Sequence, residues 1–593
     1  TPDIKPIWEP KIEFDTRIID SEDDNINSEP DFINHSEPDF INHSEQDART
    51  TIINNDDSGS ILLPNVDNQN QELDKFNQLA NIHTHPGCLD FCLNSIPIKP
   101  WVHQVKILRK VAETFPQSFL IADEVGLGKT IETGLILRYL LLAKKVKRVL
   151  ILAPASVQPQ WLEELREKFN LHFWSYSQNE FTNLIPQPLK NLTPQPPSLL
   201  GNGENSSLIG LSSLLGKGEK ERENKHSPLL AGEGLGERFN PWNSHDLILS
   251  SSHLVRRKER MQELLESEPW DLVILDEAHH ARRKSPQNRK ETPNRLLQLM
   301  TQLKEKTKSL ILLSATPMQI DAIEIFDLLY LLGLQGHWSY GDYFCSYFES
   351  LQQNPKPETL DFWQLMCGDY FQRGGVPSSK LQKFLHKKDR NLAYKIQDIW
   401  QSGKKIVNHK KILADKDAIA ASCQYLTANT PLKDLMFRHT RDTLRQYYQR
   451  GLLEKDIPIR EVYDNAIALE PQREIPLYQA VSDYVRHFYR LAQKDQRSCL
   501  GFLMTLYRKR LTSSFYAIKS SLQRRLDFLL TQQGSILSND DLADLDDADD
   551  AVITGLESYF EPVDPQEIQY LEDLLQQFDN TGEDTKLSQF IKI

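Results

Sequence analysis

A glycine-rich loop between an apolar strand and an apolar helix constrains this sequence more than any other feature. Residues 119–142 read FLIADEVGLGKTIETGLILRYLLL, which is a short apolar run, a polar turn and an apolar segment of helical length. Gly126 and Gly128 lack Cβ atoms, so the backbone there can turn successive N–H groups toward an anion at the start of the helix. Lys129 would then reach the β- and γ-phosphates of ATP, and the Thr130 hydroxyl would bind Mg²⁺.

The loop alone leaves two interpretations open. A generic phosphate loop has glycine where this chain has Asp123, and a glycine turn before a core helix would give a similar sequence. A second apolar run, 270–275, ends in the adjacent carboxylates Asp276 and Glu277. Asp276 can hold the Mg²⁺ that bridges the terminal phosphates, and Glu277 can polarise the attacking water as a general base. Together the two motifs favour nucleotide hydrolysis over two unrelated surface features.

Five apolar runs, each followed by a polar cluster, predict an α/β fold with a parallel sheet. Continuous apolar runs suit central parallel strands that are covered on both faces. The first run begins at Phe119, and the other four occupy residues 148–153, 246–250, 270–275 and 309–313. Because ligands bind outside the carboxyl ends of the strands in open α/β sheets, the polar clusters should converge on one crevice.

Charge and cysteine content limit the classes of protein. The net charge of −14 argues against a uniformly basic nucleic-acid binder. The acidic residues concentrate in residues 1–60 and 540–564, however, so a nucleic-acid partner is not excluded. Six cysteines, mostly far apart, favour a reducing cytoplasm. No apolar run is long enough to span a membrane, so we expect a cytoplasmic protein.

Three segments depart from the globular pattern. Residues 1–95 are predicted to be acidic and largely disordered, with the repeat SEPDFINH at 28–35 and 36–43. The His and Cys residues from His83 to Cys92 match no common zinc-finger spacing, and an ordinary turn with a buried thiol is favoured over a metal site. Residues from about 184 to 239 are rich in Pro, Gly and Ser and indicate a flexible insertion.

Several motifs in chain order resemble a known family. Gln104, DEVGLGKT, LAPASVQPQW, DEAHH and LSATP are similar to the first-lobe motifs of superfamily-two helicases, specifically of Swi/Snf-type DNA translocases. The Asp123-Glu124 opening is that family's form of the phosphate loop. The resemblance implies a RecA-like P-loop NTPase lobe over 96–335, a mostly helical, protrusion-like domain over 336–530, and an acidic linker over 531–593 that enters a second lobe. Among bacterial relatives, the sequence most resembles RNA-polymerase-recycling ATPases and phage-defence helicases. The resemblance does not distinguish between these two groups.

The resemblance also implies roles for residues at matching positions. Lys129, Asp276 and Glu277 would be catalytic, and Thr130 and Asp276 would hold magnesium. Gln104 would read adenine, for which a carboxamide is suited, although a lone Gln is more often a surface residue. The phosphates would be bound by Gly126, Leu127, Gly128, Lys129 and Thr130. Ser314, Ala315 and Thr316 would couple the nucleotide state to DNA. The nucleic-acid side would carry Pro154, Ser156, Trp161, Ser250, Ser251, Arg438 and Arg441.

The family's ATPase needs a second RecA-like lobe, which supplies an arginine finger. No second set of parallel strands is recognisable in the sequence after residue 530. We therefore expect the ATP-binding half of a double-stranded DNA translocase, completed by a second lobe in trans or in a longer parent chain. Further candidate phosphate contacts are Arg256, Arg257, Arg282 and Arg283. The alternative is a nucleotide-binding interaction module without productive hydrolysis. A strand-separating helicase is less favoured, because no aromatic stacking platform is identifiable.

Overall fold

The computed structural model describes most of the chain in several stretches. The described residues are 81–85, 87–177, 180–182, 240–319, 321–401, 406, 408–459, 466–494, 498–531, 566–582 and 584–592. The acidic repeat, the insertion predicted at 184–239 and most of the acidic linker lie outside them.

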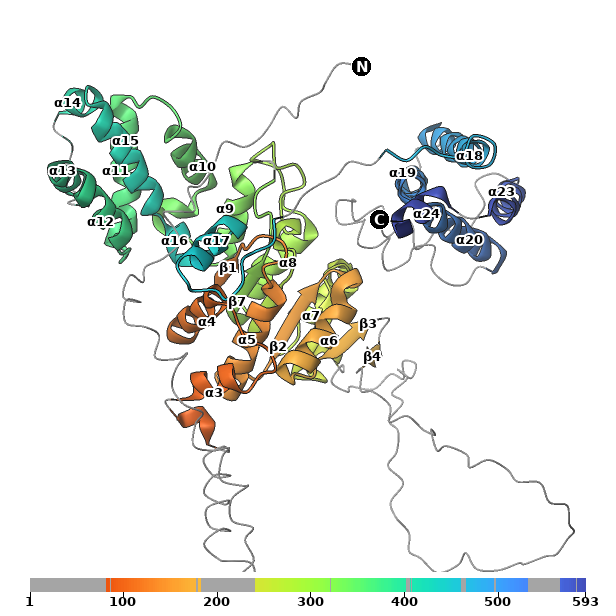
Figure 1. Cartoon of the computed structure of the whole chain (residues 1–593), viewed down its shortest axis with the longest axis horizontal. Helices are drawn as coiled ribbons and strands as arrows, with labels where there is room; N and C mark the ends of the chain where they lie inside the picture. Colours follow the sequence, from red (N-terminus) through yellow and green to blue (C-terminus); the bar gives the residue numbers. More distant parts are fainter. Residues whose placement is uncertain are drawn as a thin grey trace, which may run out of the picture.

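An eight-stranded sheet organises the first part of the described chain (Figure 1). The strand order is β4-β3-β5-β2-β6-β7-β1-β8, and neighbouring strands are parallel except for the antiparallel pair β3 and β4. The strands are β1 (Phe119–Ile121), β2 (Val149–Ala153), β3 (Trp174–Ser177), β4 (Glu180–Thr182), β5 (Leu247–Ser251), β6 (Trp270–Leu275), β7 (Thr307–Leu313) and β8 (Met436–Phe437).

The central strands are apolar throughout because both of their faces are covered. In β2, Leu150 and Leu152 enter one hydrophobic core, whereas Val149 and Ile151 enter the other. The five strands predicted from apolar runs are present as β1, β2, β5, β6 and β7. The α/β class, with a mostly parallel sheet followed by a mostly helical region, is confirmed.

Helices cover the two faces of the sheet. On one face lie α3 (Cys88–Asn94), α4 (Val102–Thr114), α5 (Lys129–Leu142) and α6 (Gln158–Phe169). On the other lie α7 (Lys258–Leu265), α8 (Arg295–Lys304) and α9 (Ala322–Leu331). Short 3-10 turns are η1 (Ile82–Thr84), η2 (Ala155–Val157), η3 (Pro241–Asn243), η4 (Leu254–Arg256), η5 (Ala278–His280) and η6 (Gly336–Ser339).

The segment from His83 to Cys92 forms η1 and α3 where the sequence suggested a turn. The Cys92 thiol is buried, and its Sγ lies 3.9 Å from Leu135 O on α5. Burial raises the pKa of the Cys92 thiol to about 12, so the thiol stays protonated and packs as an apolar group.

A helical region follows α9 and then returns to the sheet. Its helices are α10 (Gly341–Ser350), α11 (Pro357–Gln372), α12 (Ser379–Lys388), α13 (Arg390–Gln401), α14 (His409–Leu413), α15 (Lys416–Ala428) and α16 (Pro431–Leu435). Trp338, Trp363 and Trp400 are fully buried there, in a core that is continuous with that of α7 to α9. After α16 the chain forms β8 beside β1 and continues into α17 (Arg441–Gln449).

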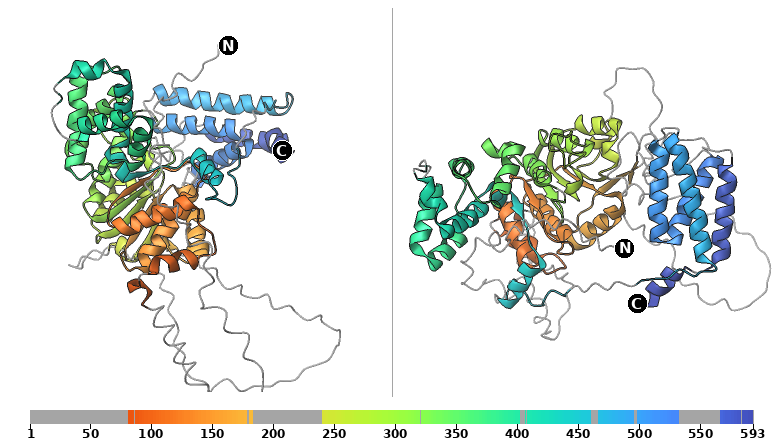
Figure 2. Two further views of the ribbon diagram at one scale, coloured as in Figure 1. Left: turned by 60° about the vertical axis from the view of Figure 1, so that its left-hand side comes forward. Right: turned by 90° about the horizontal axis from the view of Figure 1, so that it is seen from above.

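The last described helices form a separate core. α18 (Glu474–Lys494), α19 (Ser498–Ser513), α20 (Phe515–Thr531) and α23 (Glu567–Thr581) pack side by side (Figure 2). A fully buried ion pair joins α20 to α23, with Arg525 Nε 3.0 Å from Glu567 Oε1. The final helix, α24 (Thr585–Lys592), exposes Leu587, Phe590 and Ile591.

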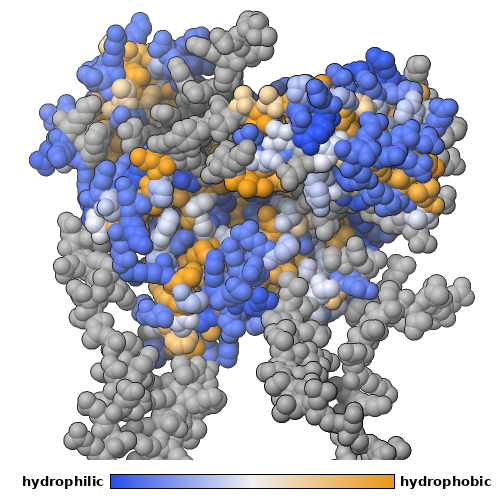
Figure 3. Space-filling view, turned by 45° about the vertical axis from the view of Figure 1, so that its right-hand side comes forward, coloured by the Kyte–Doolittle hydropathy of each residue, from blue (hydrophilic) through white to orange (hydrophobic). Residues whose placement is uncertain are grey.

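Apolar residues reach the surface in places, as the hydropathy colouring of one face shows (Figure 3). Within the described residues, however, every helix is too short or too polar to cross a membrane.

Candidate nucleotide site

Three neighbouring strands bring the predicted nucleotide motifs to one edge of the sheet. β6, β7 and β1 are consecutive in the sheet and end before Asp276, Ser314 and the glycine-rich loop, respectively. Backbone hydrogen bonds continue the sheet into these segments: Asp276 N donates to Leu152 O at 2.8 Å, and Ser314 N donates to Ile121 O at 3.0 Å. The carboxyl ends of the strands therefore hold the polar groups in one place.

The loop from Asp123 to Thr130 has the backbone geometry that phosphate binding requires. Gly126 has φ 85° and Gly128 has φ 92°, in the left-handed region that residues with a Cβ avoid. Gly128 is the N-cap of α5 and has no side chain to cap the helix. The N–H groups of the first helical turn and the positive end of the helix dipole thus remain available to an anion. Lys129 Nζ donates a 3.2 Å hydrogen bond to Asp123 O.

Gln104 lies behind the loop on α4. Its Nε2 donates to Leu127 O at 3.2 Å, and its Oε1 accepts from Trp101 N at 2.8 Å. A Cβ added to Gly128 would come within 2.8 Å of Gln104 Nε2, so glycine is also needed there for this close approach. Gln104 is 5% exposed, and its carboxamide fixes the loop to α4 in this structure. Its role toward adenine stays a prediction.

The two carboxylates after β6 have different environments. Asp276 is the more buried: its Oδ2 accepts from Trp161 Nε1 at 2.8 Å and its Oδ1 from Glu277 N at 2.9 Å. Burial raises the pKa of Asp276, and the hydrogen bond from Trp161 opposes this rise. A hydrogen bond from His279 lowers the pKa of Glu277, whose backbone is left-handed with φ 48°. The positive charge of Lys129 lowers the pKa of both carboxyls.

A chain of hydrogen bonds connects the carboxylates to the motif after β7. His279 Nδ1 lies 3.2 Å from Glu277 Oε2 and 3.1 Å from Ser314 Oγ. Ser314 Oγ also accepts a hydrogen bond from Thr316 N at 3.2 Å. The structure thus brings Glu277 and the segment Ser314–Thr316 together, with Ala315 between the two hydrogen-bonded residues.

Two residues predicted on the nucleic-acid side, Trp161 and Arg441, contact the nucleotide motifs. Trp161 is 3% exposed, and its indole N–H is directed to Asp276. Arg441 lies beside the loop, where its Nη2 donates to Val125 O at 2.8 Å and its Nε is 3.3 Å from Glu124 Oε1.

The other predicted nucleic-acid residues are spread over the ends of β2, β5 and β8. Pro154 is buried before η2, whereas Ser156 is exposed. Ser250 is buried and its Oγ donates to Tyr176 O at 3.3 Å, whereas Ser251 Oγ accepts from His253 N at 3.2 Å. Arg438 is partly exposed directly after β8.

The four remaining arginine candidates divide by burial and pairing. Arg256 is 5% exposed, whereas Arg257 is exposed. Arg282 Nη1 lies 3.6 Å from Glu324 Oε1, and Arg283 Nη2 lies 3.1 Å from Asp327 Oδ1.

Sequence reasoning missed a buried polar cluster beneath the loop, formed by His103, Asp123, Glu132 and His439. His103 Nε2 lies 3.2 Å from Glu132 Oε1, and His439 Nδ1 lies 2.9 Å from Asp123 Oδ2. The ligand atoms of His103, Asp123 and Glu132 all lie within 4.8 Å of one another, which is close enough to consider a metal ion. Glu132, the one acid in a mostly apolar helical segment, was the sequence signal that could have revealed the cluster.

Burial shifts the protonation of two groups in this cluster. Burial, and next the negative charge of Asp123, raise the pKa of Glu132 well above its usual value. Burial lowers the pKa of His103 to about 4, so that imidazole is neutral at neutral pH. A protonated Glu132 carboxyl can donate to the ionised Asp123, so the two acids can share one proton.

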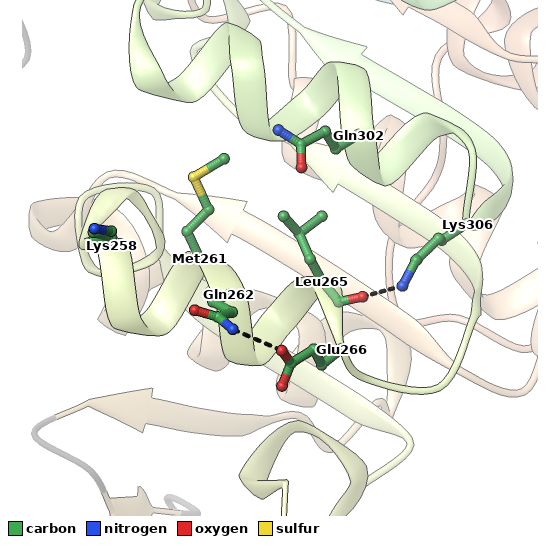
Figure 4. A pocket seen from close by; sticks show the side chains of 7 residues that line it. All are labelled: Lys258, Met261, Gln262, Leu265, Glu266, Gln302 and Lys306. Atoms are coloured by element: carbon green, nitrogen blue, oxygen red, sulfur yellow. Dashed lines mark hydrogen bonds between the residues drawn. The ribbon is translucent and has the colours of Figure 1, made fainter.

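A surface depression lies at the opposite edge of the sheet from the nucleotide motifs. α7, α8 and the turn before β7 line it with Lys258, Met261, Gln262, Leu265, Glu266, Gln302 and Lys306 (Figure 4). The backbone N–H of Trp270, the first residue of β6, donates to Lys306 O, so the depression is near the amino ends of β6 and β7. It is therefore separate from the candidate nucleotide site.

Comparison with known proteins identifies relatives. The model of one family, the SNF2-related domain, matches residues 102–426. The RNA polymerase-associated protein RapA of Cronobacter sakazakii is 27% identical over 370 residues, which are 62% of this chain and 30% of that protein. RapA of Yersinia pestis is 31% identical over 230 residues, which are 39% of this chain and 18% of that protein. This chain thus matches only a minor part of the length of these curated relatives.

Solved structures give a weaker likeness. The Sulfolobus solfataricus SWI2/SNF2 ATPase core in complex with dsDNA has a TM-score of 0.32 and 14% sequence identity, over 72% of this chain and 60% of that chain. The ATPase core domain from the same organism has a TM-score of 0.28 and 15% identity, over 82% of this chain and 74% of that one.

Proposed function

The chain belongs to the SNF2-related domain family, and from this premise we propose that it is the ATP-binding half of a Swi/Snf-type, DNA-dependent ATPase. The observation that carries the proposal is the meeting of the glycine-rich loop, Asp276 and Glu277 at the carboxyl ends of β1 and β6. Lys129 is close enough for its charge to lower the pKa of both carboxyls, so the cationic and anionic groups act in one site.

The residues present suit ATP and Mg²⁺. The left-handed glycines and the uncapped start of α5 can receive the phosphates, with Lys129 as the positive partner. The Thr130 hydroxyl and the Asp276 carboxylate are hard oxygen ligands of the type that Mg²⁺ prefers. When bound, the metal supplies charge neutralisation at the terminal phosphates.

Glu277 is suited to the role of general base. Its carboxylate is ionised at neutral pH and can accept a proton from a water molecule, and the hydrogen bond from His279, which lowers its pKa, orients it. Trp161 and the Glu277 N–H orient the Asp276 carboxylate through their hydrogen bonds. His279 links Glu277 to Ser314 and so can relay the state of the site toward the segment Ser314–Thr316.

We further propose double-stranded DNA as the nucleic-acid partner and a second RecA-like lobe, in trans or in a longer parent chain, as the source of the arginine finger. RNA polymerase or phage-defence components are candidate protein partners. In this proposal residues 96–335 form the first lobe, residues 336–530 a protrusion-like helical domain, and residues 531–593 the entry to the second lobe. Translocases of this kind hold phosphate backbones, for which a modest basic surface suffices.

One observation favours a second candidate function, a nucleotide-binding interaction module without productive hydrolysis. All strands within the described residues belong to a single sheet. These residues therefore supply one RecA-like lobe, whereas hydrolysis in this family needs two. The two candidates share nucleotide binding and differ in turnover.

The deciding experiment measures ATP binding and ATP turnover by the purified chain, with and without double-stranded DNA. Lys129→Ala should lose nucleotide binding, whereas Glu277→Gln should bind nucleotide but lose any turnover. Turnover that rises with DNA and disappears in both variants supports the ATPase. Binding without turnover, restored by adding a second lobe in trans, supports the half-enzyme. Binding that no added lobe converts into turnover favours the interaction module, and no binding at all contradicts both candidates.

DNA binding has its own test. The affinity for double-stranded DNA should fall steeply with salt, because bound phosphates release counterions. Arg438→Ala should make the slope of log K against log salt concentration shallower by about one if Arg438 contacts one phosphate. A flat salt dependence in the unmodified chain would contradict the proposed DNA interface.

A further inference from the structure

We propose that residues 436–457 brace the glycine-rich loop, and that His439 and Arg441 are positioning residues that set the loop's conformation without touching the nucleotide. These residues, here called the return segment, comprise β8, α17 and the turn that follows. The inference rests on the proposed function in one respect, namely that the loop binds nucleotide. It adds a physical connection between the loop and the helices that precede the return segment.

The return segment extends the sheet beyond the end of β1. In the parallel pair of β1 and β8, Leu120 lies opposite Met436 and Ile121 opposite Phe437. The pairing continues into the loop, where Ala122 N donates to Phe437 O at 2.7 Å and Glu124 N donates to His439 O at 3.1 Å. The first residues of the loop are thus held in an extended conformation by a strand from more than 300 residues later in the chain.

His439 anchors the acid that opens the loop. Its backbone N–H donates to Asp123 Oδ1 at 2.9 Å, and its Nδ1 lies 2.9 Å from Asp123 Oδ2. Asp123 is fully buried, which disfavours its charge, but the charge of His439 and its hydrogen bonds overcome this effect and lower the pKa of Asp123. An ionised and fully buried carboxylate costs free energy unless it is paired, so Asp123 depends on His439.

Arg441 holds the next residues of the loop. Its backbone N–H donates to Glu124 Oε2 at 2.8 Å, and its guanidinium contacts the Glu124 carboxylate and the Val125 carbonyl. A Cβ added to Gly126 would come within 3.2 Å of Arg441 Nη2, so the guanidinium lies directly against the left-handed turn. One arginine therefore fixes the backbone just before the phosphate-binding N–H groups.

An apolar contact completes the brace. Leu127 is 2% exposed and packs against Leu444, Tyr447 and Ile457 in a small hydrophobic cluster. Lys106 of α4 lies over the Tyr447 ring at 5.1 Å from its centroid. The return segment thus packs against the loop at Leu127 and contacts α4 through Tyr447.

The brace begins where the preceding helical region ends. α16 runs directly into β8, and Asp434 of α16 accepts a hydrogen bond from Tyr370 Oη of α11 at 2.8 Å. A shift of these helices would move β8 and, through it, the backbone of the loop. Nucleotide affinity should therefore respond to changes in the return segment that leave every phosphate-contacting group intact.

The test uses the full chain and two independent readouts. Affinity for a fluorescent ATP analogue is measured for His439→Gln and Arg441→Ala, and amide hydrogen exchange of the peptide spanning 122–130 is measured without nucleotide. We expect affinity to fall about tenfold in each variant, the effect of losing one hydrogen bond to a charged group, and exchange in the loop to accelerate. Arg445→Ala is the matched control, because Arg445 lies on the same helix but pairs with Asp442.

A double-mutant cycle tests whether His439 acts through Asp123. Asp123→Asn combined with His439→Gln should weaken affinity by less than the product of the two single effects, because each change breaks the same contact. A cycle in which the two effects multiply would overturn the role of His439.

The other outcomes are also decisive. Affinity within about twofold of the unmodified chain, together with unchanged loop exchange, would overturn the brace. If His439→Gln or Arg441→Ala does not fold, Glu124→Gln replaces it as the test variant. This change weakens the contact with Arg441 at a carboxylate that is 45% exposed. Nucleotide affinity and loop exchange are then measured for Glu124→Gln in the same way. If the unmodified chain binds no nucleotide, the proposed function fails, but loop exchange in the nucleotide-free chain still tests the brace.

Discussion

The indole N–H of Trp161 donates a 2.8 Å hydrogen bond to Oδ2 of Asp276. Trp161 lies on α6 and Asp276 follows β6, so this bond connects a helix on one face of the sheet to the carboxyl end of a central strand. Because burial raises the pKa of Asp276 and this bond opposes the rise, Trp161 helps to keep Asp276 ionised. A carboxyl group binds magnesium as the ionised carboxylate, so the proposed ATPase should depend on this tryptophan.

Trp161→Phe should lower ATP turnover most strongly at acidic pH. The change keeps an aromatic ring but removes the donor, so the pKa of Asp276 should rise further above its usual value. The acidic limb of the pH–rate profile should then move to higher pH, and turnover near neutral pH should fall by about three- to tenfold. The measurement is the pH dependence of kcat/KM at Mg²⁺ and ATP concentrations below saturation, which reports groups of the free enzyme.

Trp242→Phe is the matched control for this prediction. Trp242 is also fully buried, but it packs beside Tyr176 and away from the carboxylates. Its replacement should affect stability and leave the acidic limb in place. A profile for Trp161→Phe that falls uniformly at all pH values would show that the indole is structural only.

Glu132→Gln should make the stability of the chain less sensitive to alkaline pH. The folded-state pKa of Glu132 is raised well above its usual value, so the folded chain keeps a proton that the unfolded chain has lost. Stability therefore falls as pH rises from the unfolded-state pKa toward the folded-state pKa. Glutamine carries no such proton and should remove this slope.

The pH window for the Glu132 measurement follows from His103. The pKa of His103 is lowered to about 4, so the unfolded chain binds the extra proton there, and stability rises with pH between about 4 and 6.5. The two groups oppose each other below about pH 6.5, and Glu132 acts alone of the two above it. Melting temperatures between pH 6.5 and 8.5 should show the difference, with the exposed Glu163→Gln as control. Parallel slopes in the unmodified chain and Glu132→Gln would contradict the assigned protonation.

Local sequence signals predicted the central strands but not the edges of the sheet. β2 and β6 are continuous apolar runs with both faces buried, so their periodicity and length were sufficient. β8 has only two residues, Met436 and Phe437, and exists because β1 offers a free edge far away in the sequence. β3 has four residues and β4 has three, and β4 is mostly exposed. No local pattern identifies strands of this kind.

The roles of individual polar residues depend on contacts that a motif does not contain. Trp161 follows the segment after β2, which suggested the nucleic-acid side, but the path of α6 brings its indole to Asp276. The carboxamide of Gln104 donates to Leu127 O, a contact that its motif does not contain, and its predicted role toward adenine stays a prediction. The pairing of β8 with β1 brings Arg441 to the loop, and the predicted contact of Arg441 with DNA stays a prediction. Each placement arises from long-range packing.

Gly134→Ala should destabilise the contact between α5 and α6. A Cβ at Gly134 would lie 2.2 Å from Phe169 Cε2, so the aromatic ring would have to move within a packed core. Overpacking of this kind costs about 1–3 kcal/mol, which exceeds the gain in helix propensity from glycine to alanine of about 1 kcal/mol. The melting temperature should therefore fall. Gly368→Ala is the control: it lies within α11, its Cβ would meet no atom within 4 Å, and it should stabilise the chain. Equal effects of both changes would contradict the packing argument.

Arg283→Ala should reduce stability without changing the salt dependence of DNA binding. Arg283 was a candidate phosphate contact, but its Nη2 lies 3.1 Å from Oδ1 of Asp327, a side chain that is 6% exposed. Burial raises the pKa of Asp327 and Arg283 opposes the rise, so loss of the guanidinium leaves a buried carboxyl without its partner. With the partial exposure of Arg283 taken into account, we expect a loss of about 2 kcal/mol, and Asp327→Asn in the same chain should restore part of it. A shallower salt slope with unchanged melting temperature would instead assign Arg283 to the DNA interface.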